Sequence, residues 1–197
     1  MTKIEGQPAR RSEKLQERRL KIVEAAATLF IEKGFHQASM RDIAGKAGIS
    51  LGNLYNHFKG KGDIIAAIAE LETADLDLLL QLLEKAEGTG PDVLLAFARQ
   101  YYNLHKTPSY AALSAEITAE VFRNPQIGEG FLATRQHLIS AVQRHLPGGL
   151  ANTAITAGLF LDLVERAGQN AVGQPQKTQS AILGSLLDFL KRAVTPD

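Results

Sequence analysis

The sequence of 197 residues predicts an all-α protein of about nine helices. Apolar residues recur at spacings of three and four along nearly the whole chain, as on one face of a helix. No alternating run of β-branched or aromatic residues between turn dipeptides indicates a strand. Gly and Pro interrupt the periodic stretches, which is where helices end. These three observations favour a chain built from successive helices.

The composition excludes several classes of protein. Hydrophobic residues make up 45% and charged residues 22%, which is ordinary for a globular protein. The absence of Cys excludes a disulfide scaffold, a thiolate metal site and a Cys nucleophile. No apolar run reaches the roughly 18 to 20 residues of a membrane-spanning helix. The polar, charged first residues do not resemble a secretory signal, so we expect a cytoplasmic protein with no membrane partner.

The net charge of +1 conceals an asymmetry. Residues 1–61 carry 12 Lys and Arg against 6 Asp and Glu, a net charge of +6, whereas residues 62–197 carry 10 against 15, a net charge of −5. A basic end on an acidic body suggests that this end meets a polyanion. A solvated charged tail that binds nothing would show the same totals.

The first three predicted helices lie within the basic part. Residues 12–33 form the first, which Gly34 ends. Ser39 is the expected N-cap of a short second helix, and Ser50 caps a third that ends at Gly60. The third helix sets these residues on one side: Leu51, Leu54, Tyr55 and Phe58. Two short helices joined by a tight turn over about 39–58 predict a helix-turn-helix, although any helical hairpin shows this apolar spacing.

The acidic part is predicted to hold six further helices. We expect them at residues 63 to 87, 92–106, 109–123, 124–145, 150–172 and 177–194. The run 147–149, Pro-Gly-Gly, is the clearest linker. Glu116 and Glu120 stand one turn apart, a spacing usual for a solvated helix face.

The residues of the helix-turn-helix closely match a known signature. The runs GFHQASMRDIA (34–44) and AGISLGNLYNHFKGK (47–61), with ATLF (27–30) upstream, resemble the TetR-type (Tet repressor/AcrR-like) transcriptional regulators. The resemblance covers about residues 20–65. Gly62 departs from the pattern, because members more often have an acidic or polar helix former there, and we expect it to weaken the start of the fourth helix by up to about 1 kcal/mol.

The resemblance implies a ligand-responsive DNA-binding regulator, most often a repressor. It implies a DNA-binding domain over 1–61 and a ligand-binding and dimerisation domain over 62–197. A homodimer would bind a palindromic operator in double-stranded DNA and leave it when a small-molecule effector binds. The DNA-contacting positions carried over from the family are Ser39, Arg41, Ser50, Leu51, Gly52, Asn53, Tyr55, Asn56, His57 and Lys61.

Each of these residue types suits its expected contact. The Arg41 guanidinium matches guanine, and Asn53 or Asn56 would pair with adenine. Gly52 would let the helix approach the bases closely. Tyr55 and His57 correspond to phosphate contacts of the family, as does Lys61 at the start of the fourth helix. Tyr55 also lies on the predicted apolar stripe, so packing is its alternative role.

The acidic part resembles the family's sensor and dimer region in length and helix count. Candidate effector-lining residues, each with a core or surface position as the alternative, are Phe97, Tyr101, Tyr102, His105, Glu116, Phe122, Phe131 and His137. The last two helices are unusually apolar, which favours a dimer interface over a core confined to one protomer. Its candidates are Ile155, Leu159, Leu163, Ile182, Leu186 and Phe189.

The sequence offers little support for an enzyme. It has no Gly-rich phosphate loop, no metalloprotease helix signature and no nucleophile elbow. We expect no metal site and no cofactor other than the effector. The competing hypothesis is a helical adaptor whose basic hairpin contacts something other than DNA. Steep salt-dependent, sequence-selective duplex binding distinguishes the two.

Overall fold

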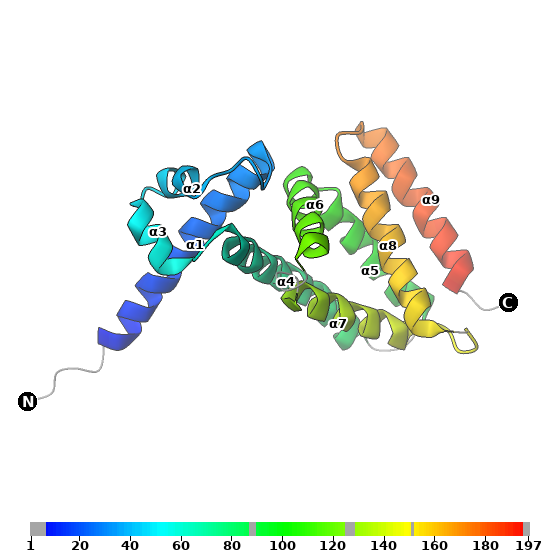
Figure 1. Ribbon diagram of the computed structural model, residues 1–197. Coiled ribbons are helices and arrows are strands. Elements are labelled where there is room, and N and C mark those ends of the chain that lie inside the picture. Colours follow the sequence, from blue (N-terminus) through cyan, green and yellow to red (C-terminus); the bar gives the residue numbers. More distant parts are fainter. Residues whose placement is uncertain (1–6, 87–89, 125–128, 151, 195–197) are drawn as a thin grey trace, which may run out of the picture. The chain divides into compact units, whose positions relative to one another are not determined.

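The computed structural model describes residues 7–86, 90–124, 129–150 and 152–194, with the backbone alone for 7–12, 72–75 and 130–131. Within these ranges it contains nine helices and no strand, which confirms the predicted all-α class (Figure 1). No helix in the described ranges is long and apolar enough to cross a membrane. The helices are α1 (Gln7–Lys33), α2 (Met40–Lys46), α3 (Leu51–His57), α4 (Lys61–Lys85), α5 (Pro91–His105), α6 (Pro108–Arg123), α7 (Glu129–His145), α8 (Thr153–Ala171) and α9 (Gln176–Val194).

Several helix ends differ from the predicted ones. α1 begins at Gln7, before the predicted residue 12. α3 ends at His57 rather than Gly60, because Phe58 is extended and its side chain is buried in the core. α4 begins at Lys61, so Gly62 lies inside its first turn, where the predicted cost of a helical glycine applies.

The starts of α7 and α8 were also predicted too early. Asn124 is not helical, and α7 begins at Glu129, while Pro125, the other residue of the predicted start, lies outside the described residues. α8 begins at Thr153 rather than at residue 150, because Asn152 before it has a left-handed backbone with φ of 53°. Such a residue interrupts a right-handed helix.

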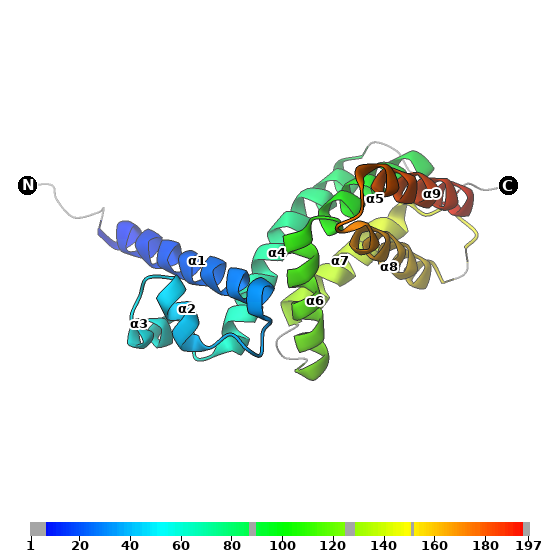
Figure 2. The ribbon, with the colours of Figure 1, turned by 90° about the horizontal axis from the view of Figure 1, so that it is seen from above.

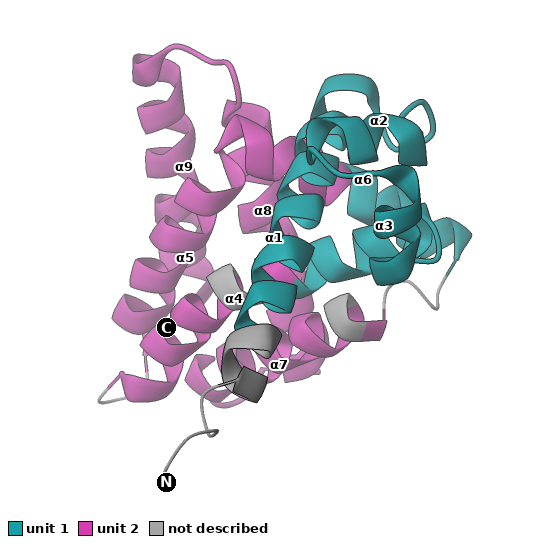
Figure 3. Ribbon diagram, turned by 90° about the vertical axis from the view of Figure 1, so that its left-hand side faces the viewer, with its two compact units in different colours: residues 1–70, 116–128 teal, residues 71–115, 129–197 magenta. Residues whose placement is uncertain are grey.

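The chain divides into two compact units (Figure 3). The first, teal, comprises residues 1–70 and 116–128, and the second, magenta, comprises residues 71–115 and 129–197. α4 and α6 each contribute residues to both units. Each unit has buried apolar residues of its own and is described separately below.

In the first unit, α2 and α3 lie on one side of α1 (Figure 2). Both short helices are held by local caps. The Ser39 hydroxyl accepts from the Asp42 backbone N–H at 3.1 Å, and the Asp42 carboxylate accepts from the Ser39 N–H at 3.0 Å, a capping box. Ser50 Oγ accepts from the Asn53 N–H at 3.2 Å. Gly48, with φ of +67°, makes the turn between them.

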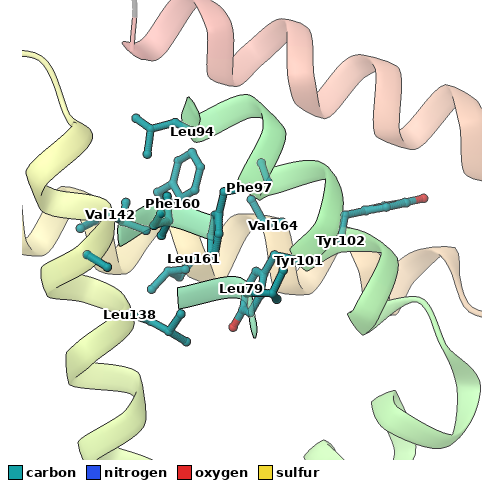
Figure 4. Packing of buried hydrophobic residues seen from close by; sticks show 14 of the residues in the cluster. Leu79, Leu94, Phe97, Tyr101, Tyr102, Leu138, Val142, Phe160, Leu161 and Val164 are labelled. Atoms are coloured by element: carbon teal, nitrogen blue, oxygen red, sulfur yellow. The ribbon is translucent and has the colours of Figure 1, made fainter. Parts of the chain in front are cut away.

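The second unit is built around α5, which packs against α7, α8 and α9. Its core is a continuous apolar cluster (Figure 4). Phe97 stacks on Tyr101 with ring centroids 5.4 Å apart and lies 6.4 Å from Phe160 of α8. The other labelled members of the cluster are Leu79, Leu94, Tyr102, Leu138, Val142, Leu161 and Val164.

α5 and α8 approach each other closely at Gly168. A Cβ atom at this position would lie 2.8 Å from His105 Cβ and 2.9 Å from the Tyr102 carbonyl oxygen. Real Cβ atoms do not approach other atoms so closely, so the crossing requires glycine. The backbone of α5 at residues 102–105 is thereby fixed against α8.

We expect Gly168→Ala to destabilise the protein by about 1–3 kcal/mol, as overpacking of a core does. The control is Gly158→Ala on the same helix, where a Cβ would meet only Ile139 Cδ1 at 3.9 Å, an ordinary contact. That variant should be neutral or more stable by up to about 1 kcal/mol, since alanine favours helix. Urea unfolding of both variants measures the difference, and equal stabilities would show that α5 and α8 do not need this close approach.

Candidate nucleic-acid interface and ligand pocket

α3 presents most of its residues to the surface. Leu54 is its only fully buried residue, and Ser50 before it, Gly52 and Asn56 are exposed. Leu51, Asn53 and His57 are half-buried. Tyr55 is 51% exposed, so the predicted apolar stripe is wrong on this point. Only Leu54 and, directly after the helix, Phe58 are fully buried in this stretch.

The start of α2 is exposed beside this face. Ser39 and Arg41 both lie at the surface. The hydrogen bonds from the Ser39 hydroxyl and backbone hold the pKa of the Asp42 carboxyl below its usual value. The Ser39 hydroxyl therefore has a structural task in the cap, whatever else it contacts.

Lys61 has a well-defined position within the first unit. Its Nζ donates to the carbonyl oxygens of Phe35 at 2.6 Å and His36 at 3.1 Å, and lies 4.7 Å from the centre of the Phe35 ring. An ammonium group has three N–H donors, so these two bonds leave one for a phosphate. Lys61 thus ties the turn between α1 and α2 to the first residue of α4.

The same turn is held by two carboxylates of α6. Glu116 accepts from the Phe35 N–H at 3.1 Å, and Glu120 Oε1 lies 3.2 Å from His36 Nε2. Glu120 also pairs with Arg123 and is only 5% exposed. The two glutamates therefore do not form the solvated face that their spacing suggested, because both point at a loop 81 or more residues earlier in the chain.

The second unit contains a small pocket with a cavity volume of about 10 Å³, room for about one water molecule. It is walled by residues of five helices, α4 to α8. Two of them, Tyr101 and His105, are predicted effector residues. The others are Leu76, Tyr110, Ser114, Arg135, Leu138 and Glu165.

The charges of this pocket are paired with one another. Arg135 forms ion pairs with Asp162 and, at 3.5 Å, with Glu165. Burial raises the pKa of the Glu165 carboxyl, an effect that nearby Arg135 opposes. Burial also raises the pKa of the Tyr101 hydroxyl, with a further contribution from the Glu165 charge. The pocket is therefore lined by the Arg135 guanidinium, which is already paired with two carboxylates, and by the uncharged hydroxyl of Tyr101.

His105 is buried here with unused hydrogen-bonding capacity. It is 3% exposed, and neither ring nitrogen has a hydrogen-bond partner among the described residues. Its ring lies edge-on to Tyr101, with centroids 4.4 Å apart, and to Tyr110, with centroids 5.0 Å apart. Burial, reinforced by the Arg135 charge, lowers the pKa of His105 to about 4. The imidazole is therefore neutral at pH 7.

The other predicted effector residues lie elsewhere. Phe97 belongs to the apolar core. The Tyr102 hydroxyl donates to the Gln179 carbonyl at 2.9 Å and so ties α5 to α9. Phe122, in the first unit, is 85% exposed. His137 lines a separate open groove between α4 and α7. Glu116 holds the turn described above, and the side chain of Phe131 lies outside the described residues.

Four polar residues that line the pocket were not predicted from the sequence: Tyr110, Ser114, Arg135 and Glu165. Arg135 and Glu165 carried a usable signal, since each places a charge on a helix that also packs into the core. Their spacing does not reveal that they meet, because they stand on different helices, 30 residues apart.

The predicted interface residues divide into two groups. Ile155 and Leu159 are each 63% exposed, Phe189 is 53% exposed and Leu163 is 39% exposed. Leu186 is buried at 7% exposure, and Ile182 packs against the core. The second pair thus holds α9 to its own protomer, while the first four remain at the surface.

The neutral His105 makes stability depend on pH. An unfolded histidine takes up a proton near pH 6.5 whereas folded His105 does so near pH 4, so the unfolded state binds more protons between these values. Stability should therefore fall as the pH falls through this window, by about 2 kcal/mol from pH 8 to pH 5. Urea unfolding should show this loss in the wild type and in the surface variant His137→Phe, but not in His105→Phe. The same loss in His105→Phe would assign it to another group.

Comparison with known proteins places this architecture in a family. The sequence profile described as "Bacterial regulatory proteins, tetR family" matches residues 22–68, from α1 into α4. The chain is 35% identical over 161 residues to the HTH-type transcriptional regulator UidR of Escherichia coli K12, covering 75% of this chain and 78% of UidR. The transcriptional repressor KstR2 of Rhodococcus jostii is 34% identical over 102 residues, which is 52% of this chain and 46% of KstR2.

Solved structures share the fold. GusR of Salmonella enterica superposes with a TM-score of 0.72 at 24% identity, over 90% of this chain and 95% of GusR. A transcriptional regulator of Rhodococcus sp. Rha1 gives a TM-score of 0.73 at 24% identity, over 89% and 95% of the two chains. The relatives are transcriptional regulators and not enzymes. This chain belongs to the tetR family of DNA-binding transcriptional regulators.

Proposed function

We propose that this regulator is a repressor that binds a palindromic operator as a homodimer and leaves it when a small-molecule effector binds. Residues 1–61 would carry DNA binding, and residues 62–197 effector binding and dimerisation. It would act in the cytoplasm, where its DNA lies. That a relative, KstR2, is named a repressor supports the mode of action.

The observation that carries the proposal is the exposed face of α3. With Leu54 alone fully buried, the helix keeps the side chains around Asn53 and Asn56 available to base edges. Nothing lies within 4 Å of where a Gly52 Cβ would stand, so a duplex can approach the backbone there. Tyr55, at 51% exposure, is free of the core and suited to a phosphate contact.

Removing a base-reading residue should change DNA binding differently from removing a phosphate-contacting residue. Arg41→Ala or Asn53→Ala should cost about 1–3 kcal/mol of preference for the operator over a scrambled duplex. Lys61→Ala should weaken both duplexes alike, partly because the turn at Phe35 loses its support. Fluorescence anisotropy with the chain's own upstream DNA, across a salt series, measures both effects.

The control for these variants is Arg99→Ala, which removes an exposed cation from α5. It should leave affinity and salt dependence unchanged. A uniform loss on both duplexes in Arg41→Ala and Asn53→Ala would contradict their assignment as base readers. If the wild type bound the operator and the scrambled duplex equally well, the repressor proposal itself would be wrong.

The exposed apolar residues of α8 and α9 support the homodimer. The two helices pack side by side (Figure 1), and Ile155, Leu159, Leu163 and Phe189 remain uncovered within one protomer. Burying a large apolar side chain contributes about 1.5–3 kcal/mol. A twofold axis through this face would bury each residue twice and present two copies of α3 to a palindrome.

We expect Leu159→Glu to convert the dimer to a monomer and to weaken operator binding at least tenfold. The charge would be buried twice in the interface, whereas Leu159 is 63% exposed in the protomer, which should therefore fold normally. Leu78→Glu, at 66% exposure on α4, is the matched control and should remain dimeric. Sedimentation equilibrium gives the mass of each variant, and a dimeric Leu159→Glu would place the interface elsewhere.

A further inference from the structure

We propose that the first part of α1, residues 13–21, is a second DNA-contacting element, which binds backbone phosphates of the duplex through Lys14, Arg18 and Arg19. These residues lie outside the helix-turn-helix formed by α2 and α3. The contact deepens the proposed function and rests on it, because the duplex is the one that α3 binds.

The first part of α1 packs on almost nothing. Every residue from 13 to 21 is exposed, whereas Ile22, Val23 and Ala26 further along the helix are almost completely buried. The first turns of α1 extend past α2 and α3 (Figure 1). Most of the stability of a protein helix comes from the packing of one of its faces. A partner that bound along this stretch would supply the packing that the chain itself does not.

The cations and the carboxylates of this stretch lie on different sides of the helix. Lys14 and Arg18 stand eight and four residues before the buried Ile22, so they continue the line of the side that α1 turns toward the core. Glu13 and Glu17 each stand one residue earlier, about 100° further round the axis and away from the core-facing side. The stretch therefore presents one cationic side rather than a mixed surface.

The carboxylates do not neutralise these cations. Glu17 pairs with Lys21, whose Nζ lies 3.1 Å from its Oε1. Lys14, Arg18 and Arg19 form no ion pair within the described residues. Three unmatched positive charges on one short stretch of helix favour a polyanion as the partner.

Arg19 connects this cationic side to the end of α3. Its guanidinium carbon lies 4.4 Å from the centre of the Phe58 ring. Phe58 is 1% exposed and directly follows His57, the last residue of α3. Stacking holds the plane of the guanidinium but leaves the N–H groups at its edge available. A phosphate that His57 contacts would therefore lie close to Arg19.

These side chains suit phosphates of the backbone. Arginine binds a phosphate through two parallel N–H groups, and lysine binds one as a point charge. Residues 13–21 span about 13 Å at roughly 1.5 Å per residue. Phosphates of one strand recur about every 3.4 Å along the duplex axis. A helix lying along one strand would thus meet about three or four phosphates, enough for all three cations.

The double variant Lys14→Gln/Arg18→Gln tests the contact and should fold normally, since both side chains are exposed. In a homodimer it removes four phosphate contacts. Each contributes about 0.9 to the slope of log affinity against log salt, so the slope should become shallower by about 3 to 4. At about 0.1 M salt the affinity should fall at least tenfold, equally for the operator and a scrambled duplex. Fluorescence anisotropy of the full chain with its own upstream DNA, across a salt series, measures both effects.

The matched control is Glu13→Gln/Glu17→Gln, which changes two charges on the other side of the same stretch. It should keep the wild-type slope. A slope that changes as much in the control would assign the effect to net charge and overturn the proposal. A wild-type slope in Lys14→Gln/Arg18→Gln would overturn it too, because those cations would then face solvent or another partner.

Two variants separate the contact of Arg19 with phosphate from its packing on Phe58. Arg19→Leu keeps an apolar side chain against the ring and loses the charge, while Arg19→Lys keeps the charge and loses the stacked plane. The slope should become shallower by about 2 in Arg19→Leu and stay unchanged in Arg19→Lys. A wild-type slope in Arg19→Leu would show that Arg19 only packs on Phe58. Urea unfolding of each variant checks that the slopes compare folded proteins.

The same salt series separates the α1 contact from the proposed function. If the wild type prefers its operator but the cation variants keep the wild-type slope, the proposed function holds and the α1 contact is wrong. If the wild type binds the operator and the scrambled duplex alike, the repressor proposal is wrong. The slopes measured on either duplex then still decide whether α1 contacts DNA.

Discussion

The second unit depends on one steric constraint, the approach of α5 to α8 at Gly168. Because the α8 backbone meets His105 Cβ and the Tyr102 carbonyl, the rotation of α5 about its axis is set at its C-terminal end. Phe97, Tyr101 and Tyr102 then belong to the apolar cluster (Figure 4), and the Tyr102 hydroxyl reaches Gln179 of α9. This one crossing therefore fixes the positions of the Phe97 and Tyr101 rings in the core and of the His105 ring.

The same rotation decides what remains at the surface. The hydrogen bond from the Tyr102 hydroxyl to the Gln179 carbonyl holds α9 against α5, and Leu186 and Leu190 of α9 are buried. The outer side of α8 and α9 is left with Leu159 and Phe189 uncovered.

Local features of the fold were predictable from the sequence and distant ones were not. The caps at Ser39 and Ser50 act within three residues, so the residue types alone reveal them. The role of Lys61 depends on carbonyl groups 25 and 26 residues away, and that of Glu116 on an N–H 81 residues away. Helical periodicity says which side of a helix is buried, but not which partner it meets. This is why Tyr101 and His105 were found while Arg135 and Glu165 were missed.

The polar groups of the second unit keep fixed charge states. With its pKa lowered to about 4, His105 keeps one protonation state through the physiological range. Arg135, paired with Asp162 and Glu165, keeps its charge satisfied with or without a ligand. The cavity beside the His105 ring is about 10 Å³, which matches about one water molecule. Since that ring sits on the residues that Gly168 fixes, the crossing of α5 and α8 sets both the neutral state of the ring and the small space beside it.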